Sequence, residues 1–98
     1  MTLELAGKPL AIQAEDRLSF CWMLECLLEG RPSFRSLKAN WEGELVYLFT
    51  RHQSYLQQRW PCLYVMAKGW ERPIVISDKR EWFYCLKSLE RLETRKGL

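Results

Sequence analysis

The sequence predicts a small α+β domain in which an antiparallel sheet, built from two hairpins, is covered by two to three helices in the order ββ-α-α-ββ-α. Three observations lead to this prediction. The chain has 98 residues, which suffices for one hydrophobic core and not for two. Two segments alternate apolar and polar residues around turn residues, as β-hairpins do. Three other segments repeat apolar residues at intervals of three and four, as helices do. We expect one domain over 1–98, with a fraying tail at about 94–98.

Two hairpins are expected, one at the N-terminus and one in the second half of the chain. Residues 3–12 alternate Leu and Ile with polar neighbours on both sides of an Ala-Gly-Lys-Pro turn at 6–9. Two further apolar runs, 62–67 and 73–77, are joined by the loop 68–72. Each pattern is typical of neighbouring antiparallel strands, so both hairpins are predicted to belong to the sheet.

Start and stop residues mark a helix near each end of the chain. Glu15 and Asp16 supply an acidic first turn and Gly30 supplies a stop, which together predict a helix over 15–29. Asp78 precedes Glu81 by three residues, which is the spacing of a capping box at a helix N-terminus. The inward stripe of this C-terminal helix is expected to consist of Trp82, Cys85, Leu86, Leu89 and Leu92.

The segment 42–59 admits two interpretations. Its apolar residues recur at three and four positions as far as Leu56, which predicts a second helix. The stretch ELVYLFT within it is rich in residue types that favour strands. We expect the helix, because a strand would lose the spacing before Leu56, and the pair Trp60 and Pro61 would end it. The connection before 42 is expected to hold at most a short helical turn.

Composition and charge narrow the function classes. The net charge of +3 and the pI near 8.8 fall short of the basic balance of a dedicated nucleic-acid-binding protein. The N-terminus has neither the basic start nor the apolar region of a signal peptide, so the expected location is the cytoplasm, with the four cysteines reduced. The longest apolar stretch is too short to cross a bilayer, so no membrane partner is expected.

No motif for catalysis, metal binding or cofactor binding stands out in the sequence. Cys21 and Cys26 lie five residues apart, about 140° around a helix, and cannot share an ion without unwinding it. The single histidine, His52, falls on a predicted apolar stripe, and the glycines do not form a phosphate-binding loop. We therefore expect a non-enzymatic protein with no cofactor and no metal. An enzyme assembled across a dimer interface is a third hypothesis.

The first predicted helix has an unusually wide apolar surface. The stretch LSFCWMLECLLEG places its apolar residues over an arc of roughly 220°, about twice what a surface helix needs. Either this helix lies centrally under the sheet and a second helix, or part of the arc faces another subunit. On the remaining narrow face, Trp22 lies among Glu15, Glu25 and Glu29. Two roles are open for this side chain: it docks a basic or aromatic group of a partner, or it packs on the loop 30–40 of its own chain.

The C-terminal helix also carries a basic face. Its spacings of three and four place on one side Arg80, Tyr84, Lys87, Arg91 and Arg95. Such a face can contact phosphates through the cations and stack a base on the tyrosine ring. The alternative is a solvated helix surface without a partner, which is common for charge runs of this kind.

The loop KGWERP places Trp70 between Lys68 and Arg72 at the tip of the second hairpin. An exposed loop aromatic beside cations is a plausible contact for a partner. The alternative is that Trp70 folds back as a lid over the core.

Two function hypotheses follow. The first is a small regulatory protein that docks on another protein. In one form of this hypothesis the protein also self-associates into a dimer. The second is a nucleic-acid-binding module that uses the basic face of the C-terminal helix. The candidate binding residues for both are Trp22, Trp70, Arg80, Tyr84, Lys87 and Arg91.

Overall fold

The computed structural model shows a six-stranded antiparallel sheet and two α-helices. It describes residues 3–31, 33, 36–51 and 61–96, of which 93–96 are described for their backbone alone. The strands are β1 (Leu3–Leu5), β2 (Lys8–Ile12), β3 (Leu37–Trp41), β4 (Glu44–Arg51), β5 (Cys62–Met66) and β6 (Ile74–Ile76). The helices are a 3-10 turn η1 (Ala14–Asp16), α1 (Arg17–Glu29) and α2 (Lys79–Lys96).

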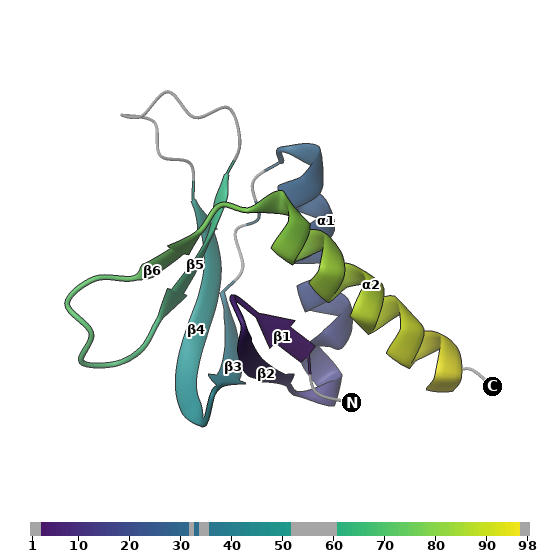
Figure 1. The fold of residues 1–98 in the computed structure, drawn as a ribbon, viewed down its shortest axis with the longest axis horizontal. Helices are drawn as coiled ribbons and strands as arrows, with labels where there is room; N and C mark the ends of the chain where they lie inside the picture. Colours follow the sequence, from purple (N-terminus) through teal and green to yellow (C-terminus); the bar gives the residue numbers. More distant parts are fainter. Residues whose placement is uncertain (1–2, 32, 34–35, 52–60, 97–98) are drawn as a thin grey trace.

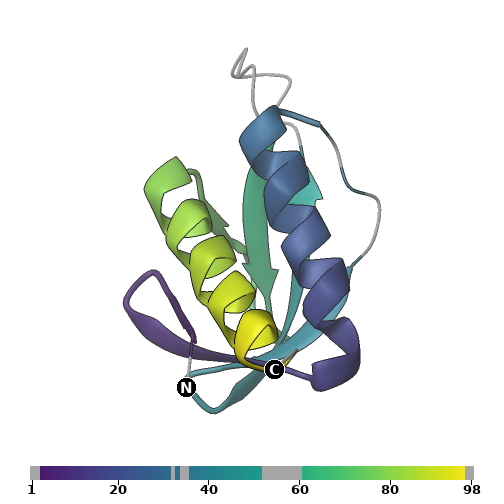
Figure 2. The same ribbon diagram turned by 90° about the vertical axis from the view of Figure 1, so that its right-hand side faces the viewer.

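The six strands follow one another across the sheet in the order of the sequence, and the sheet curls into a half-barrel. Both helices lie on one face of it and run antiparallel, side by side (Figures 1 and 2). Neither helix covers the opposite face. The element order is therefore ββ-α-ββββ-α, which confirms the α+β class and corrects the order predicted from the sequence.

The predicted helix at 42–59 is wrong where the structure describes it, since residues 44–51 form the strand β4 and 52–60 lie outside the described residues. The connection before it, where at most a short helical turn was expected, contains the strand β3. Along β4 the side chains of Val46 and Leu48 are buried and those of Leu45 and Tyr47 are exposed, which is the alternation of a strand. The two predicted hairpins are confirmed as β1–β2 and β5–β6.

Two tight turns of the same kind set the register of the first four strands. Ala6 and Gly7 join β1 to β2, and Glu42 and Gly43 join β3 to β4; all four have a positive φ, between 52° and 84°. Such two-residue turns match the twist of antiparallel strands and normally use Asn or Gly at the first position. The Asn40 side chain supports the second turn, because its Oδ1 accepts a hydrogen bond of 2.8 Å from the amide of Gly43.

The hydrophobic core lies between the inner face of the sheet and the two helices. Helix α1 fills it with five side chains that are at most 1% exposed, namely Phe20, Met23, Leu24, Cys26 and Leu27. The wide apolar arc of this helix is thus occupied by packing within the chain. In the described part of the chain, no helix combines the length and apolarity needed to span a membrane.

Two tryptophans fasten strands to the core by hydrogen bonds as well as by packing. Trp41 on β3 is 4% exposed, and its Nε1 donates to the carbonyl oxygen of Leu5 at 3.0 Å. Trp82 on α2 is fully buried, and its Nε1 donates to the carbonyl oxygen of Ile76 at 3.2 Å. Both indole N–H groups are satisfied inside the core, so both rings are buried without a polar penalty.

The helix ends follow the expected signals with two exceptions. Gly30 ends α1 in the left-handed conformation, at φ 75°. Asp78 caps α2, because its Oδ1 accepts a hydrogen bond of 2.9 Å from the amide of Arg80. The reciprocal half of the expected capping box is not formed: Glu81 Oε2 lies buried without a hydrogen-bond partner. The first helix begins at Arg17, because residues 14–16 form a 3-10 turn.

Candidate functional site

The basic face predicted for the C-terminal helix lies on the exposed side of α2. Tyr84 is 68% exposed, and Arg80, Lys87 and Arg91 are exposed around it; the side chain of Arg95 lies outside the described residues. Two of these cations already have carboxylate partners. Arg80 is 3.2 Å from Asp78, and Lys87 is 3.2 Å from Glu90. The ion pairs reduce the charge that the face can offer to phosphate groups.

The Arg80 pair also shifts titration at the start of the helix. Hydrogen bonds from the side chain and the backbone amide of Arg80 hold the pKa of Asp78 below its ordinary value. Asp78 therefore stays ionised wherever the protein is folded near neutral pH, and its main role is to cap α2.

An aromatic residue that the sequence analysis missed lies beside this face. Phe83 is 46% exposed, and the Lys87 Nζ lies 5.5 Å from the centre of its ring. Together with Leu28 at the end of α1, Phe83 and Tyr84 line an open groove of about 300 Å³. The signal was present, because Phe83 lies off the inward stripe of the predicted helix and an apolar residue there faces solvent.

The two tryptophans singled out from the sequence occupy different surroundings. Trp22 lies on the outer side of α1 and is 43% exposed. Trp70 is partly buried and packs edge to face on Trp41, with ring centres 6.5 Å apart. Trp70 thus lies against the core, and its loop is far from α2 (Figure 1). The structure does not gather the predicted residues into one site.

A second surface, absent from the sequence analysis, lies on the outer face of the sheet. Alternate side chains of β4, β5 and β6 point away from the helices and form what we call the outer sheet patch, made of Leu45, Tyr47, Phe49, Tyr64 and Val75. Phe49 and Tyr64 are cross-strand partners whose rings stack at 5.3 Å and 11°. Of the patch, the most exposed side chains are Leu45 at 57%, Val75 at 41% and Tyr47 at 38%.

Two cations border the outer sheet patch. The Nζ of Lys38 on β3 lies 6.0 Å from the ring centre of Tyr47, and the guanidinium carbon of Arg51 lies 5.4 Å from that of Phe49. The outward positions of β3 to β6, all of which the structure describes, carry no carboxylate, so Lys38 and Arg51 give this face a positive sign. Cations over aromatic rings are held in place and remain available to an anionic partner.

The chemistry of the cysteine thiols is that of core residues. The four cysteines are thiols rather than disulfides. Cys85 Sγ donates a hydrogen bond of 2.9 Å to the carbonyl oxygen of Glu4, and burial raises the pKa of Cys85 to about 12. Burial also raises the pKa of Cys26 and of Cys62. Because the thiolate is the reactive form, these three thiols are poor nucleophiles near neutral pH.

Within the described residues, no three His, Cys, Asp or Glu side chains gather where they could hold a metal ion. His52 and the remainder of the predicted stripe after it lie outside those residues. Among the features that the structure does bring together are two exposed apolar surfaces with cationic borders, one on the sheet and one on α2.

These observations define a class of architecture: a small α+β domain with a curled six-stranded sheet, two helices on one face and an aromatic patch on the other. No family model, no curated protein and no solved structure matches the chain. The function must therefore be argued from the surfaces themselves.

Proposed function

We propose that the protein is a non-enzymatic interaction module that binds another protein through the outer sheet patch. The observation that carries this proposal is the exposure of Leu45, Tyr47 and Val75 on a sheet face that neither helix covers. Clustered exposed apolar side chains of this kind mark interaction surfaces in soluble proteins. The expected partner is a segment with an apolar stripe bordered by carboxylates, which would meet Lys38 and Arg51.

The wide apolar arc of α1 does not support docking by that helix. The side chains of that arc are buried or partly buried under the sheet and α2, whereas Leu18 and Trp22, which lie off the arc, are exposed at 72% and 43%. The outer sheet patch exposes three large apolar side chains together, so we place the docking surface there. A second copy of the chain fits the patch less well than a different partner. A two-fold contact through this face would set cations against cations, with no carboxylate on the outward positions of β3 to β6 to pair with them.

A single-stranded nucleic acid also fits the patch less well than an acidic protein segment. Phosphate-driven affinity grows with the number of cations engaged, and this face offers two. The aliphatic side chains of Leu45 and Val75 gain little from a polar phosphate backbone and more from apolar side chains of a partner.

A peptide titration tests the proposal. The probe is an amphipathic peptide whose Leu and Phe stripe is bordered by glutamates, followed by NMR chemical shifts of the protein. We expect saturable shifts at Tyr47, Phe49, Lys38 and Arg51. Tyr47→Ser is expected to weaken binding about tenfold, because it removes an exposed anchor, and Lys38→Glu to weaken it further through charge reversal.

Tyr84→Ser is the matched control, since it removes the same ring from α2, where Tyr84 is 68% exposed against 38% for Tyr47. It should leave peptide binding unchanged. The proposal is overturned if the shifts map to α2, if a version of the peptide with lysines in place of glutamates binds equally well, or if a mixed-sequence oligonucleotide shifts the patch and the acidic peptide does not.

A second candidate function is nucleic-acid binding through α2. It is favoured by the exposed Tyr84 ring beside Arg80, Lys87 and Arg91. The double variant Arg80→Glu, Lys87→Glu should then abolish a salt-sensitive binding of oligonucleotide, whereas Tyr47→Ser should not affect it.

A further inference from the structure

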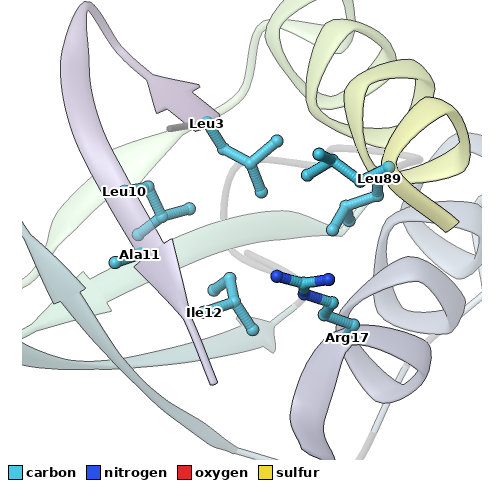
Figure 3. A pocket seen from close by; sticks show the side chains of 7 residues that line it. Leu3, Leu10, Ala11, Ile12, Arg17 and Leu89 are labelled. Carbon is cyan, nitrogen blue, oxygen red and sulfur yellow. The ribbon is translucent and has the colours of Figure 1, made fainter. Parts of the chain in front are cut away.

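A small cavity lies on the helix side of the sheet, at the end where the first hairpin meets both helices (Figure 3). It has a volume of about 150 Å³. Its walls include Leu3, Leu10 and Ile12 from the hairpin, Leu89 and Leu92 from α2, and Arg17 from α1. An otherwise aliphatic cavity thus contains one guanidinium group.

The guanidinium of Arg17 has an unmet hydrogen-bonding need. In Figure 3 it points into the space between Ile12 and Leu89. Its Nη1 is buried and has no hydrogen-bond partner. A buried charged donor without an acceptor is costly, so a structure that keeps one gains from any ligand that supplies the acceptor. The planar guanidinium fork matches the two oxygens of a carboxylate.

The size of the cavity limits the rest of the ligand. One water occupies about 30 Å³ of liquid, and an apolar cavity of about 150 Å³ accommodates a single benzene ring. The lining combines polar atoms with aliphatic side chains from β1, β2 and α2, so it suits a ligand that has both a polar group and an apolar body.

We propose that this cavity binds a small organic monocarboxylate with a compact apolar body, of the size of benzoate or a branched short-chain acid. The apolar body lies among the leucines and the carboxylate pairs with Arg17. Because the cavity and the outer sheet patch lie on opposite faces of the sheet, this inference does not depend on the proposed function.

The test uses benzoate as the probe and the full chain as the protein. Titration is followed by methyl NMR and by thermal unfolding. We expect saturable shifts of the methyl groups of Leu3, Leu10 and Leu89, and a rise in Tm of about 5 °C or more at ten times the Kd. Benzamide, which has the same shape without the charge, should bind several-fold more weakly.

Two arginine variants locate the site. Arg17→Met keeps the length of the side chain and removes the charge, and it should weaken benzoate binding at least about tenfold, since a charge-assisted pair is lost. Arg72→Met is the matched control, because Arg72 is an exposed arginine outside the cavity, and it should bind benzoate like the wild type. The inference is overturned if Arg17→Met binds equally well, if benzamide matches benzoate, or if millimolar benzoate causes no saturable shift. If Arg17→Met does not fold, the comparison of benzoate with benzamide on the wild type decides.

Discussion

The two faces of the sheet are built from the same strands and both carry large apolar side chains, but they have different surroundings. On the inner face Val46 and Leu48 of β4 are completely buried by the helices. On the outer face their neighbours Leu45 and Tyr47 remain 57% and 38% exposed. The inner side chains are accounted for by the stability of the domain. The outer ones are not, and this difference is the reason to propose that the outer face binds a partner.

Leucine truncation on either side of β4 tests the comparison most strongly. Leu48→Ala should lower the free energy of unfolding by about 2–5 kcal/mol, because it leaves a cavity in a closely packed core. Leu45→Ala should change it by less than about 0.5 kcal/mol, as for other surface substitutions. Chemical denaturation of both variants measures the difference. Equal losses would mean that the outer face is also part of the core and would remove the basis of the proposed function.

The pH dependence of stability sharpens the comparison on the inner side. The Cys85 thiol titrates near its ordinary value of 9.0 in the unfolded chain, whereas burial raises its pKa to about 12 in the folded protein. The unfolded state therefore binds fewer protons above pH 9, and stability is lost as the pH rises from 9 towards 12, by roughly 1 kcal/mol per unit.

Replacing the thiol isolates this effect. Cys85→Ser keeps a donor for the carbonyl oxygen of Glu4 and does not titrate in this range. The free energy of unfolding should fall less between pH 7 and pH 10 in Cys85→Ser than in the wild type. If the free energy of unfolding falls equally with pH in both proteins, the loss of stability at alkaline pH comes from other groups.

The smallest effect is expected at the exposed start of α2. Asp78→Ala removes the acceptor for the amide of Arg80, so it should lower the Tm, though by less than Leu48→Ala does. Hydrogen bonding to Arg80 lowers the pKa of Asp78, so its contribution is complete above the ordinary value of 3.8 and is lost as the pH falls further. Thermal unfolding of wild type and Asp78→Asn at pH 7 and pH 3 checks the sign. A larger difference in Tm between wild type and Asp78→Asn at pH 3 than at pH 7 would contradict this pH dependence.

The sequence predicts those parts of the fold whose signals are local. The two hairpins, the stop at Gly30 and the start of α2 after Asp78 each depend on residues within a few positions of one another. The strand β4 was mistaken for a helix because Leu45, Leu48 and Phe49 satisfy a spacing of three and four by chance. The buried residues Val46 and Leu48 follow the alternation of a strand. The sequence alone does not show whether the core is met by this pair or by the residues with helical spacing.

The outer sheet patch was missed for the same reason. Tyr47 and Phe49 face one side only if the segment is a strand, and their neighbour Tyr64 comes from a different hairpin. The turn that would have revealed the strand uses Glu42 at a positive φ, where Asn or Gly is the usual residue. Of the aromatic residues predicted to bind, Tyr84 is the most exposed, and Arg80, Lys87 and Arg91 around it are exposed on α2. Their pairing with acidic residues depends on rotamers that spacing alone does not fix.

The contact between α2 and β1 has a consequence for how the protein is made. Helix α2 packs on the first strand, and Cys85 reaches the backbone of Glu4 across 81 positions of the chain. A nascent chain that has not yet released residues 79–96 from the ribosome can form the middle of the sheet, but it leaves β1 uncovered. Completion of the core therefore waits for α2, and during that interval the apolar side chains of β1 have no helix over them.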